Sequence, residues 1–317
     1  MKFGLMFVNV GPFGLPDHLE NLGRCAEEAG IESAFTVEHV VVPKDYQSEY
    51  PYSPTGKMPG DETAPIPDPV LPLAFLAAVT EKLRLGTGVM ILPQRHPAYV
   101  AKQAATLDTL SGGRAILGVG IGWAQEEFAG LGVEYKRRGA ITNEYLEAIK
   151  LLWTQDLASY EGRYVSFKDV DTAPRPLRSP HIPIWVGGPS DAALRRAVRY
   201  GDAWHPIRMR MDWFKNTGIP RLQEIAAEEG RPVPALCPRV KLHVTGSPMP
   251  EEERVVGEGT LDQIHRDMAE LESIGCEYVL LDTYLDDPEA LRKPEDAWKL
   301  YADMAKNVLD LGNQTVR

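Results

Sequence analysis

A histidine that follows a predicted strand is the first residue whose type and position could do chemistry. Residues 33–37 form a short predicted strand, and Glu38 and His39 follow it directly. A histidine at such a position can donate a hydrogen bond, act as a general acid or base, or bind a metal ion. The alternative interpretation is a structural histidine that bonds to a neighbouring loop.

Two common hydrolytic chemistries lack their signatures. The seven histidines form no His-x-His pair and no His-Glu-x-x-His motif, so metal catalysis is disfavoured and no metal ligand is assigned. No Gly-x-Ser-x-Gly elbow occurs either, which weakens a serine hydrolase interpretation.

A glycine-rich turn at residues 185–191 could hold a phosphate. Gly187 and Gly188 expose backbone amides after a predicted strand, and Ser190 is a good N-cap for the helix that follows. A helix start of this kind can bind an anion. The alternative is a tight turn without a ligand. No Gly-x-Gly-x-x-Gly follows the first predicted strand, so a Rossmann dinucleotide site is not indicated.

Residues 85–123 carry the densest pattern in the chain. Apolar runs at 83–92 and 115–119 enclose a predicted helix at 97–110, which gives a strand–helix–strand unit of a parallel sheet. Both runs contain or meet glycine-rich segments. Gly88 is either a kink that lets the sheet curve or a backbone support for a planar ring. Trp123 and Trp204 follow predicted strands and would suit a flat conjugated ligand.

The elements that must position these residues alternate along the whole chain. We predict an α/β fold, a (β/α)8 TIM barrel with inserted loops after strands two and four, formed as a single domain of residues 1–317. A doubly wound sheet is the second choice. The loop at 40–69 is rich in proline and is either a lid over the site or a surface insertion. The predicted strands are 2–8, 33–37, 83–92, 115–119, 182–186, 203–204, 240–244 and 278–281, and the predicted helices include 17–30, 97–110, 138–153, 190–200 and 294–311. Capping boxes are expected at Asp17 and at Thr260 with Gln263, and residues 155–181 are expected to be irregular.

Composition restricts the partners and the compartment. The net charge of −11 argues against nucleic acid and anionic membranes, because both need a positive surface. The three cysteines are widely spaced and odd in number, which disfavours a disulfide framework and favours a reducing cytoplasm. The apolar N-terminus is too short for a membrane span and is expected to form the first strand. A small-molecule substrate fits these properties.

The whole chain resembles the luciferase-like monooxygenase superfamily, whose members use a flavin or a deazaflavin in a (β/α)8 barrel. Within it, the chain is most similar to the F420-dependent oxidoreductase group of actinobacteria. The segments that carry the resemblance are residues 3–7, Glu38-His39, residues 85–123, residues 185–188 and residues 201–204.

The resemblance implies roles for individual residues. A cis peptide is expected between Gly88 and Val89, as a bulge under the middle of the ring, with Thr87 near its pyrimidine edge. His39 is expected near the reacting carbon. The remaining expected cofactor contacts are Gly120 and Trp123 at the exit of strand four and the phosphate turn of Gly187, Gly188 and Ser190.

One departure from the family concerns the catalytic acid. Sugar-phosphate dehydrogenases of the family have a glutamate where Trp123 stands here, and Glu126 and Glu127 follow one helical turn later. The departure disfavours a sugar-phosphate substrate. Glu126 is kept as a candidate catalytic residue beside His39, and the proton donor stays open. Arg208 and Arg210 are candidates for contacting an acidic substrate or a cofactor tail.

These expectations converge on an oxidoreductase that transfers a hydride between coenzyme F420 and a small organic substrate. The alternative is an FMN-dependent monooxygenase that uses reduced flavin and oxygen, since the same barrel accommodates either ring. A cofactor-binding protein without activity is the second class. The resemblance also implies a homodimer. The sequence identifies neither the substrate nor the direction of the reaction.

Overall fold

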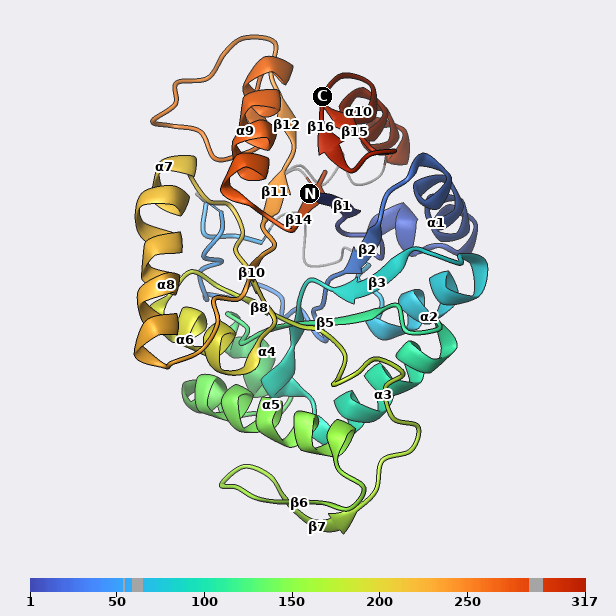
Figure 1. The fold of residues 1–317 in the computed structure, drawn as a ribbon, viewed down its shortest axis with the longest axis vertical. Coiled ribbons are helices and arrows are strands. Elements are labelled where there is room, and N and C mark those ends of the chain that lie inside the picture. The colour runs from blue at the N-terminus through green and yellow to red at the C-terminus, as the bar shows by residue number, and fades with distance from the viewer. Residues whose placement is uncertain (54, 59–64, 285–292) are drawn as a thin grey trace.

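The computed structural model describes residues 1–53, 55–58, 65–284 and 293–317. Strands and helices alternate along the chain, and helices lie around the outside of a curled central sheet (Figure 1). The sheet strands are β1 (Lys2–Leu5), β2 (Ser33–Thr36), β3 (Arg84–Thr87), β4 (Met90–Ile91), β5 (Ala115–Gly120), β8 (Ile184–Gly187), β9 (Ala203–His205), β10 (Ala235–Leu236), β11 (Arg239–Lys241) and β14 (Tyr278–Asp282).

Helices α1 to α9 lie in the chain between strands of this sheet, and α10 follows its last strand. They are α1 (Pro16–Ala29), α2 (Val70–Val79), α3 (Pro97–Leu110), α4 (Gln125–Gly130), α5 (Arg138–Thr154), α6 (Asp191–Tyr200), α7 (Met211–Trp213), α8 (Ile219–Glu228), α9 (Leu261–Ile274) and α10 (Pro294–Asn307). Short 3-10 turns lie at Gly11–Gly14, Leu92–Gln94 and Tyr135–Arg137, and a π turn lies at Phe214–Gly218. Three strand pairs stand outside the main sheet: β6 (Ala158–Glu161) with β7 (Ser166–Val170), β12 (His243–Val244) with β13 (Glu258–Gly259), and β15 (Leu309–Asp310) with β16 (Thr315–Val316).

The main sheet is parallel throughout. Its strand order is β10-β9-β8-β5-β3-β2-β1-β14-β11, with β4 also paired to β5. The end strands β10 and β11 are separated in the chain only by Cys237 and Pro238. The amide of Cys237 donates to Trp204 O at 3.0 Å, and the amide of Leu280 donates to Pro238 O at 3.0 Å. This segment therefore bonds to both neighbouring strands. The predicted α/β class is confirmed, and the parallel sheet is curled.

Burial on both faces explains the apolar character of the strands. All five residues of β14 and the first five of β5 are buried, as expected for parallel strands covered by helices. Inside the sheet, Phe35 stacks on Trp185 at 4.9 Å between ring centroids, and Trp185 meets Tyr278 edge-on at 5.0 Å. The interior therefore contains an aromatic cluster below the carboxyl ends of the strands.

Two predicted strands are interrupted. The expected continuous strand at 83–92 is β3 and β4, and the predicted cis peptide between Gly88 and Val89 lies between them. The expected strand at 240–244 is also wrong as a single element. Its first part, β11, pairs with β14, whereas its second part leaves the sheet as β12 and pairs with β13.

The expectation that residues 155–181 lack regular structure is wrong. They contain the β6–β7 hairpin, which projects from the lower end of the molecule in Figure 1. Glu144 on α5 holds its turn, since the carboxylate accepts hydrogen bonds from the amides of Tyr164 at 2.6 Å and Val165 at 2.7 Å. These contacts with a helix distant in sequence have no local signal.

Helix ends were predicted with mixed success. The capping box at Asp17 is wrong, because α1 starts one residue earlier at Pro16 and its N-cap, Leu15, has no side-chain hydrogen bond. Thr260 does form the expected capping box of α9 with Gln263. The last helix ends at 307 rather than 311, because the chain then turns into β15.

Arg114 secures the turn that returns α3 to β5. Its buried guanidinium donates to the carbonyls of Ser111, Leu83, Ala77 and Thr80 and to the hydroxyl of Thr80, at 2.6 to 3.0 Å. Every one of the five N–H donors of an arginine is thereby used. The turn joins the C-terminal end of α2 to the start of two neighbouring strands.

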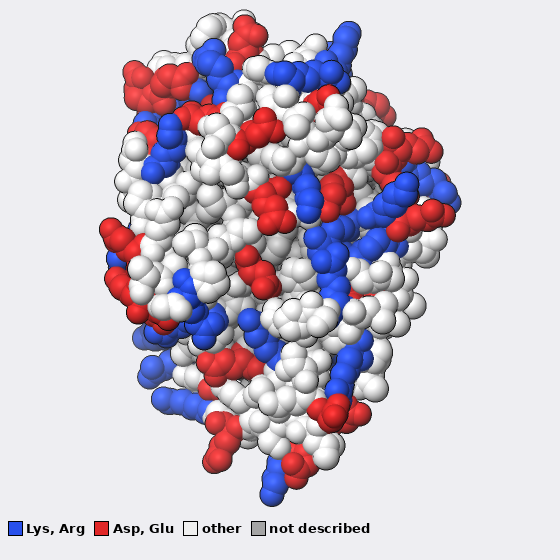
Figure 2. Space-filling view, in the orientation of Figure 1, with Lys and Arg blue, Asp and Glu red and all other residues white. Residues whose placement is uncertain are grey.

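Charges of both signs are distributed over the surface. Figure 2 shows basic and acidic side chains interspersed on one face of the molecule, and several form ion pairs, such as Arg221 with Asp191 at 2.6 Å and Arg195 with Glu228 at 2.8 Å. Within the described residues, none of the helices has the length and apolar character needed to span a membrane.

Candidate active site

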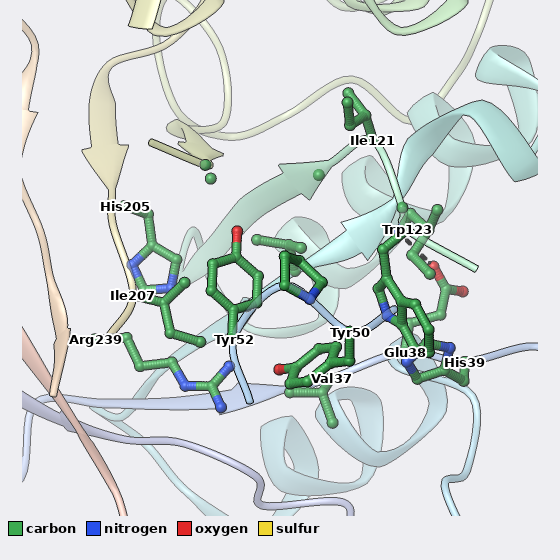
Figure 3. A pocket seen from close by; sticks show the side chains of 18 of the residues that line it. Val37, Glu38, His39, Tyr50, Tyr52, Ile121, Trp123, His205, Ile207 and Arg239 are labelled. Atoms are coloured by element: carbon green, nitrogen blue, oxygen red, sulfur yellow. Dashed lines mark hydrogen bonds between the residues drawn. The ribbon is translucent and has the colours of Figure 1, made fainter. Parts of the chain in front are cut away.

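A cavity of about 470 Å³ lies at the carboxyl ends of the strands. Its wall combines strand ends with the loop that follows β2, and Figure 3 shows His39 and His205 on opposite sides of it with Tyr50 and Tyr52 between them. The expected site residues on its wall are His39, Gly88, Val89, Gly120, Trp123, Gly187, Gly188 and Ser190. Active sites of barrels built from parallel strands lie at this end.

His39 is oriented by a buried glutamate. Its Nδ1 lies 3.0 Å from Oε2 of Glu127, whose side chain is only 1% exposed. The other oxygen of Glu127 accepts the amide of Val40 at 2.7 Å. One carboxylate therefore holds both the imidazole and the backbone beside it. With Nδ1 engaged, Nε2 is the nitrogen left for a proton transfer.

A second buried carboxylate fixes the backbone before His39. Glu38 pairs with Arg95, which also pairs with Asp68 at 2.9 Å, and Glu38 Oε2 accepts the amide of Ile91 at 2.6 Å. Burial raises the pKa of Glu38, while the charge of Arg95 acts in the opposite direction. The network ties the end of β2 to β4 and to the end of the loop.

Glycines near the centre of the cavity make room for Val89. A Cβ atom on Gly120 would come within 2.6 Å of a methyl group of Val89, and one on Gly187 within 3.4 Å of the other.

Thr87 does not line the cavity. Its hydroxyl donates to Gly118 O at 2.7 Å and accepts the amide of Gly118 at 3.0 Å, so it joins β3 to β5 beside the cis peptide.

Two arginines stand near the Gly-Gly-Pro-Ser turn. Gly188 has a φ of +106°, and Ser190 caps α6 by accepting the amide of Ala193 at 3.3 Å. Arg138 and Arg196 line the same cavity, and Arg196 lies on α6, the helix that Ser190 caps. Among the described residues, neither forms an ion pair with a carboxylate: Arg138 donates to Gly122 O and Tyr135 O, and Arg196 to Asn143 Oδ1 and Gly139 O. Uncompensated positive charge beside a helix N-terminus favours an anionic ligand.

A family model settles the relationship suggested by this geometry. The model described as luciferase-like monooxygenase matches residues 1–256, most of the chain. The chain belongs to the luciferase-like monooxygenase family.

Curated relatives of this luciferase-like protein include enzymes of two cofactor types. A Mycobacterium tuberculosis protein described as uncharacterized is 34% identical over 222 residues, which cover 67% of the chain and 78% of the relative. The F420-dependent glucose-6-phosphate dehydrogenase of Kineococcus radiotolerans is 31% identical over 221 residues, covering 68% and 60%. The FMNH(2)-dependent dimethylsulfone monooxygenase of Pseudomonas putida is 39% identical over 133 residues, covering 41% and 36%.

Solved structures share the luciferase-like fold over nearly the whole chain. The monooxygenase RslO1 from Streptomyces bottropensis superposes with a TM-score of 0.71 at 23% identity, covering 96% of this chain and 98% of that chain. An F420-dependent secondary alcohol dehydrogenase superposes with a TM-score of 0.72 at 17% identity, covering 94% and 98%.

Glu126, a candidate catalytic residue from the sequence, lies outside the cavity wall of this luciferase-like protein. Its carboxylate accepts the hydroxyl of Ser48 at 2.6 Å and the amides of Gln47 at 2.9 Å and Ser48 at 3.1 Å. The hydrogen bond from the Ser48 side chain is the main reason that the pKa of Glu126 falls to about 2. The carboxylate therefore anchors the loop after β2 to α4.

The anchored loop closes around Trp123. The indole makes edge contacts with Tyr46 at 5.3 Å, Tyr50 at 5.2 Å and His39 at 5.7 Å between ring centroids. Tyr50 and Tyr52 line the cavity. The part of the predicted loop at 59–64 lies outside the described residues.

Three other candidates from the sequence are placed away from the cavity wall. Arg208 donates to Tyr52 O at 2.5 Å, and Arg210 pairs with Asp212 at 2.9 Å. Trp204 is fully buried and its indole donates to Gly188 O at 2.9 Å, so it supports the turn from below. Within the described residues, no cluster of three or more His, Cys, Asp or Glu side chains could hold a metal ion.

Several wall residues of the luciferase-like site were missed. His205 ends β9 and is 3% exposed, with Nδ1 at 2.6 Å from Cys237 O. Arg138 and Arg196 come from α5 and α6, which pack against each other. Glu127 was recognised only as the neighbour of Glu126. The helical periodicity of α4 could have indicated that only one of the two faces the core.

Proposed function

We propose that the chain is an oxidoreductase that transfers a hydride between the deazaflavin coenzyme F420 and a small organic substrate. The observation that carries the proposal is one cavity in which the His39–Glu127 pair, the glycine-lined surface around Val89 and the Ser190 turn face a common space. When bound, the deazaflavin supplies hydride transfer at its C5 position, and the protein orients the ring and excludes water.

The residues of the cavity fit such a cofactor. The amides at the start of α6 and the guanidinium groups of Arg138 and Arg196 would hold its phosphate. Burial lowers the pKa of Arg196, and an anion beside it would offset that cost. Gly120 leaves the surface around Val89 open, because a Cβ atom there would come within 2.6 Å of a methyl group of Val89.

In this proposal His39 handles the proton and Glu127 positions it. Nε2 of His39 donates or accepts the proton that accompanies hydride transfer, and Glu127 stabilises the charge of the protonated ring. Glu126 serves as the anchor of the loop after β2. Trp123, at the place of the family's sugar-phosphate acid, favours a substrate other than a sugar phosphate.

The choice of F420 is supported by the extent of the similarity. The match to the F420-dependent dehydrogenase extends over 221 residues, against 133 for the FMNH(2)-dependent monooxygenase. The higher identity of the shorter match, 39% against 31%, favours an FMN-dependent monooxygenase as the second candidate. The cavity features described above suit either ring.

Titration of the purified protein with each cofactor, followed by cofactor fluorescence, tests the proposal. We expect tighter binding of F420 than of FMN. Ser190→Pro removes both the side-chain cap and an amide donor and should raise the Kd of the preferred cofactor about tenfold. Ser190→Ala removes the cap alone and is the control. Comparable or tighter FMN binding would replace the first candidate with the second.

We further propose that the curled sheet is the (β/α)8 barrel of the family.

We also propose that the chain forms a homodimer. Helix α2 is apolar on all sides, and the side chains exposed on one of its faces are Leu71, Phe75 and Ala78. Apolar residues at such spacing share a helix face and suit burial against a second copy. Sedimentation velocity should give a dimer mass, and Leu71→Asp should shift the equilibrium toward monomer. A wild-type monomer at micromolar concentration would refute the dimer.

A further inference from the structure

The side of the cavity opposite His39 contains a second histidine with an unused nitrogen. His205 ends β9 in register with Gly187, and its ring lies on the cavity wall (Figure 3). The side chain is buried, and within the described residues Nε2 has no hydrogen-bond partner. Buried polar atoms in native proteins normally have a partner. A ligand in the cavity can supply one here.

The partner of the other nitrogen decides what Nε2 can do. Nδ1 of His205 lies 2.6 Å from the carbonyl oxygen of Cys237. A carbonyl oxygen only accepts hydrogen bonds, so Nδ1 carries the hydrogen. In the neutral ring, Nε2 then has a lone pair and is an acceptor. Burial lowers the pKa of His205 to about 4, and the positive charge of Arg239 acts in the same direction.

Aromatic packing holds the ring of His205 in place. Phe35 lies below it with nearly parallel rings, 6.5 Å between centroids, and Trp185 lies at 5.7 Å. The imidazole is therefore fixed from one side by the interior cluster and from Nδ1 by the backbone. Its acceptor nitrogen is preorganised before any ligand arrives.

The surroundings of Nε2 are apolar and nearly neutral. Ile207 lies beside His205, and Tyr52, Tyr50 and Val37 lie between it and His39 (Figure 3). Arg239 carries a charge on this side of the cavity, and Asp282 neutralises that charge through contacts of 2.8 and 2.9 Å. Arg239 also lies over the ring of Phe7 at 4.4 Å. An ionised ligand would find no unpaired opposite charge in this group of residues.

We propose that Nε2 of His205 is the hydrogen-bond acceptor of the substrate subsite, and that this subsite takes a compact apolar molecule bearing one neutral donor, such as a hydroxyl group. The assignment rests on the proposed function, because it presumes that the cofactor occupies the part of the cavity between His39 and Ser190. The subsite would then distinguish three classes of ligand by the group that each presents to Nε2. A hydroxyl donates to Nε2, an ether or ketone leaves it unpaired, and a carboxylate faces its lone pair.

Binding of matched aromatic probes tests the subsite. Phenol, anisole and benzoate share a ring and differ in the group presented to Nε2. Their dissociation constants are measured by tryptophan fluorescence on the protein loaded with its preferred cofactor and on the cofactor-free protein. We expect phenol to bind about tenfold more tightly than anisole, as for one hydrogen bond to a buried acceptor, with benzoate weakest. Equal affinities for phenol and anisole would overturn the proposal.

Two variants assign the preference to His205. His205→Phe keeps the packing on Phe35 and Trp185 and should abolish the preference for phenol. His181→Phe is the matched control, since His181 also bonds to a backbone carbonyl, at 2.9 Å, and stacks on Trp153 outside the cavity wall. The control should keep the preference. If His205→Phe weakens cofactor binding and leaves the phenol preference intact, His205 contacts the cofactor and the proposal is wrong.

A measurement on the wild-type protein keeps the test independent of variant folding. With ¹⁵N-labelled histidine, NMR should report hydrogen on Nδ1 of His205 at pH 7, and phenol but not anisole should perturb the Nε2 resonance. Hydrogen on Nε2 would overturn the proposal. If neither cofactor binds but the protein still prefers phenol to anisole, the proposed function is rejected and the assignment of Nε2 as an acceptor is supported.

Discussion

The two sides of the cavity each present a histidine, and the two differ in the partner of Nδ1. His39 is held by the carboxylate of Glu127, and His205 by the carbonyl of Cys237. A carboxylate stabilises the positive charge of a protonated ring, whereas a carbonyl in an aromatic, buried setting keeps the ring neutral. One side of the cavity is thus suited to move a proton and the other to recognise one.

The comparison teaches that residue type and strand position do not determine the role of a histidine. Both side chains follow or end a strand of the same sheet and line the same cavity. Their proposed roles differ because α4 brings an acidic residue to one, while the segment after β10 brings only backbone to the other. The partner at Nδ1 is a tertiary property in both cases.

The largest effect on the rate should come from replacing His39, the residue proposed to move the proton. His39→Ala should lower the single-turnover rate by about 100- to 10,000-fold, the usual contribution of general acid–base catalysis. The cofactor Kd should change far less, because the phosphate turn is untouched. Stopped-flow kinetics and cofactor titration give the two quantities, with circular dichroism as the control for folding. A variant with the full rate would assign His39 to a structural role.

The neutral state of the His205 ring should make the protein less stable at low pH. The folded pKa of His205 is about 4, against 6.5 for the free group, so the unfolded chain takes up the proton first as the pH falls. The contribution of neutral His205 to the free energy of unfolding is fully present above pH 6.5. It is lost as the pH falls toward 4, which lowers the free energy of unfolding by about 3 kcal/mol. Urea unfolding at pH 7 and pH 4 should show that loss in wild type and His181→Phe, but not in His205→Phe. Equal losses in all three would contradict the neutral assignment.

Two adjacent glutamates sharpen the assignment of the proton-moving side. Glu127→Gln keeps a hydrogen-bonding group beside His39 and removes the charge, so the turnover rate should fall about 10- to 100-fold, part of the full acid–base contribution. Glu126→Gln is the matched control, and its rate should stay within about threefold of wild type, because a loop anchor acts only indirectly. Steady-state kinetics on the same substrate compares them. The opposite ranking would restore Glu126 as the catalytic acid.

The smallest effect concerns the loop between the two sides. Ser48→Ala removes the hydroxyl that Glu126 accepts at 2.6 Å, and should raise the cofactor Kd about two- to fivefold, as for one partly exposed hydrogen bond. Fluorescence titration measures the change, and Ser53→Ala, in the same loop but bonded only within it, is the control. A larger effect from Ser53→Ala would mean that the anchor lies elsewhere.

Local signals account for the parts of the fold that were predicted well. The helix at 97–110 matches α3 at both ends, because Pro97 suits a helix start and the glycines after Ser111 end it. Thr260 and Gln263 form their capping box for the same reason. The break in the strand at 83–92 is different. The glycine pattern indicated a kink there, but only the pairing of β3 and β4 with different parts of β5 sets the break.

The site was predictable only where one segment carries the information. Gly187, Gly188 and Ser190 form a turn within four residues, and their joint position followed from the sequence. Arg138 and Arg196 reach the same place from two helices, and nothing in their spacing relates them. Glu126 and Glu127 are neighbours in the chain, so the choice between them depends on which face of α4 meets the core.

All five N–H donors of Arg114 are used inside the fold, and this shows that part of the motif at residues 85–123 serves the scaffold. Its five hydrogen bonds go to residues at the end of α2 and before β3 and β5, and none of these residues lines the cavity. Such a residue serves the scaffold whichever reaction the scaffold hosts. The segment around Arg114 therefore identifies the scaffold, and the substrate must be assigned from the cavity wall, where Trp123 and His205 lie.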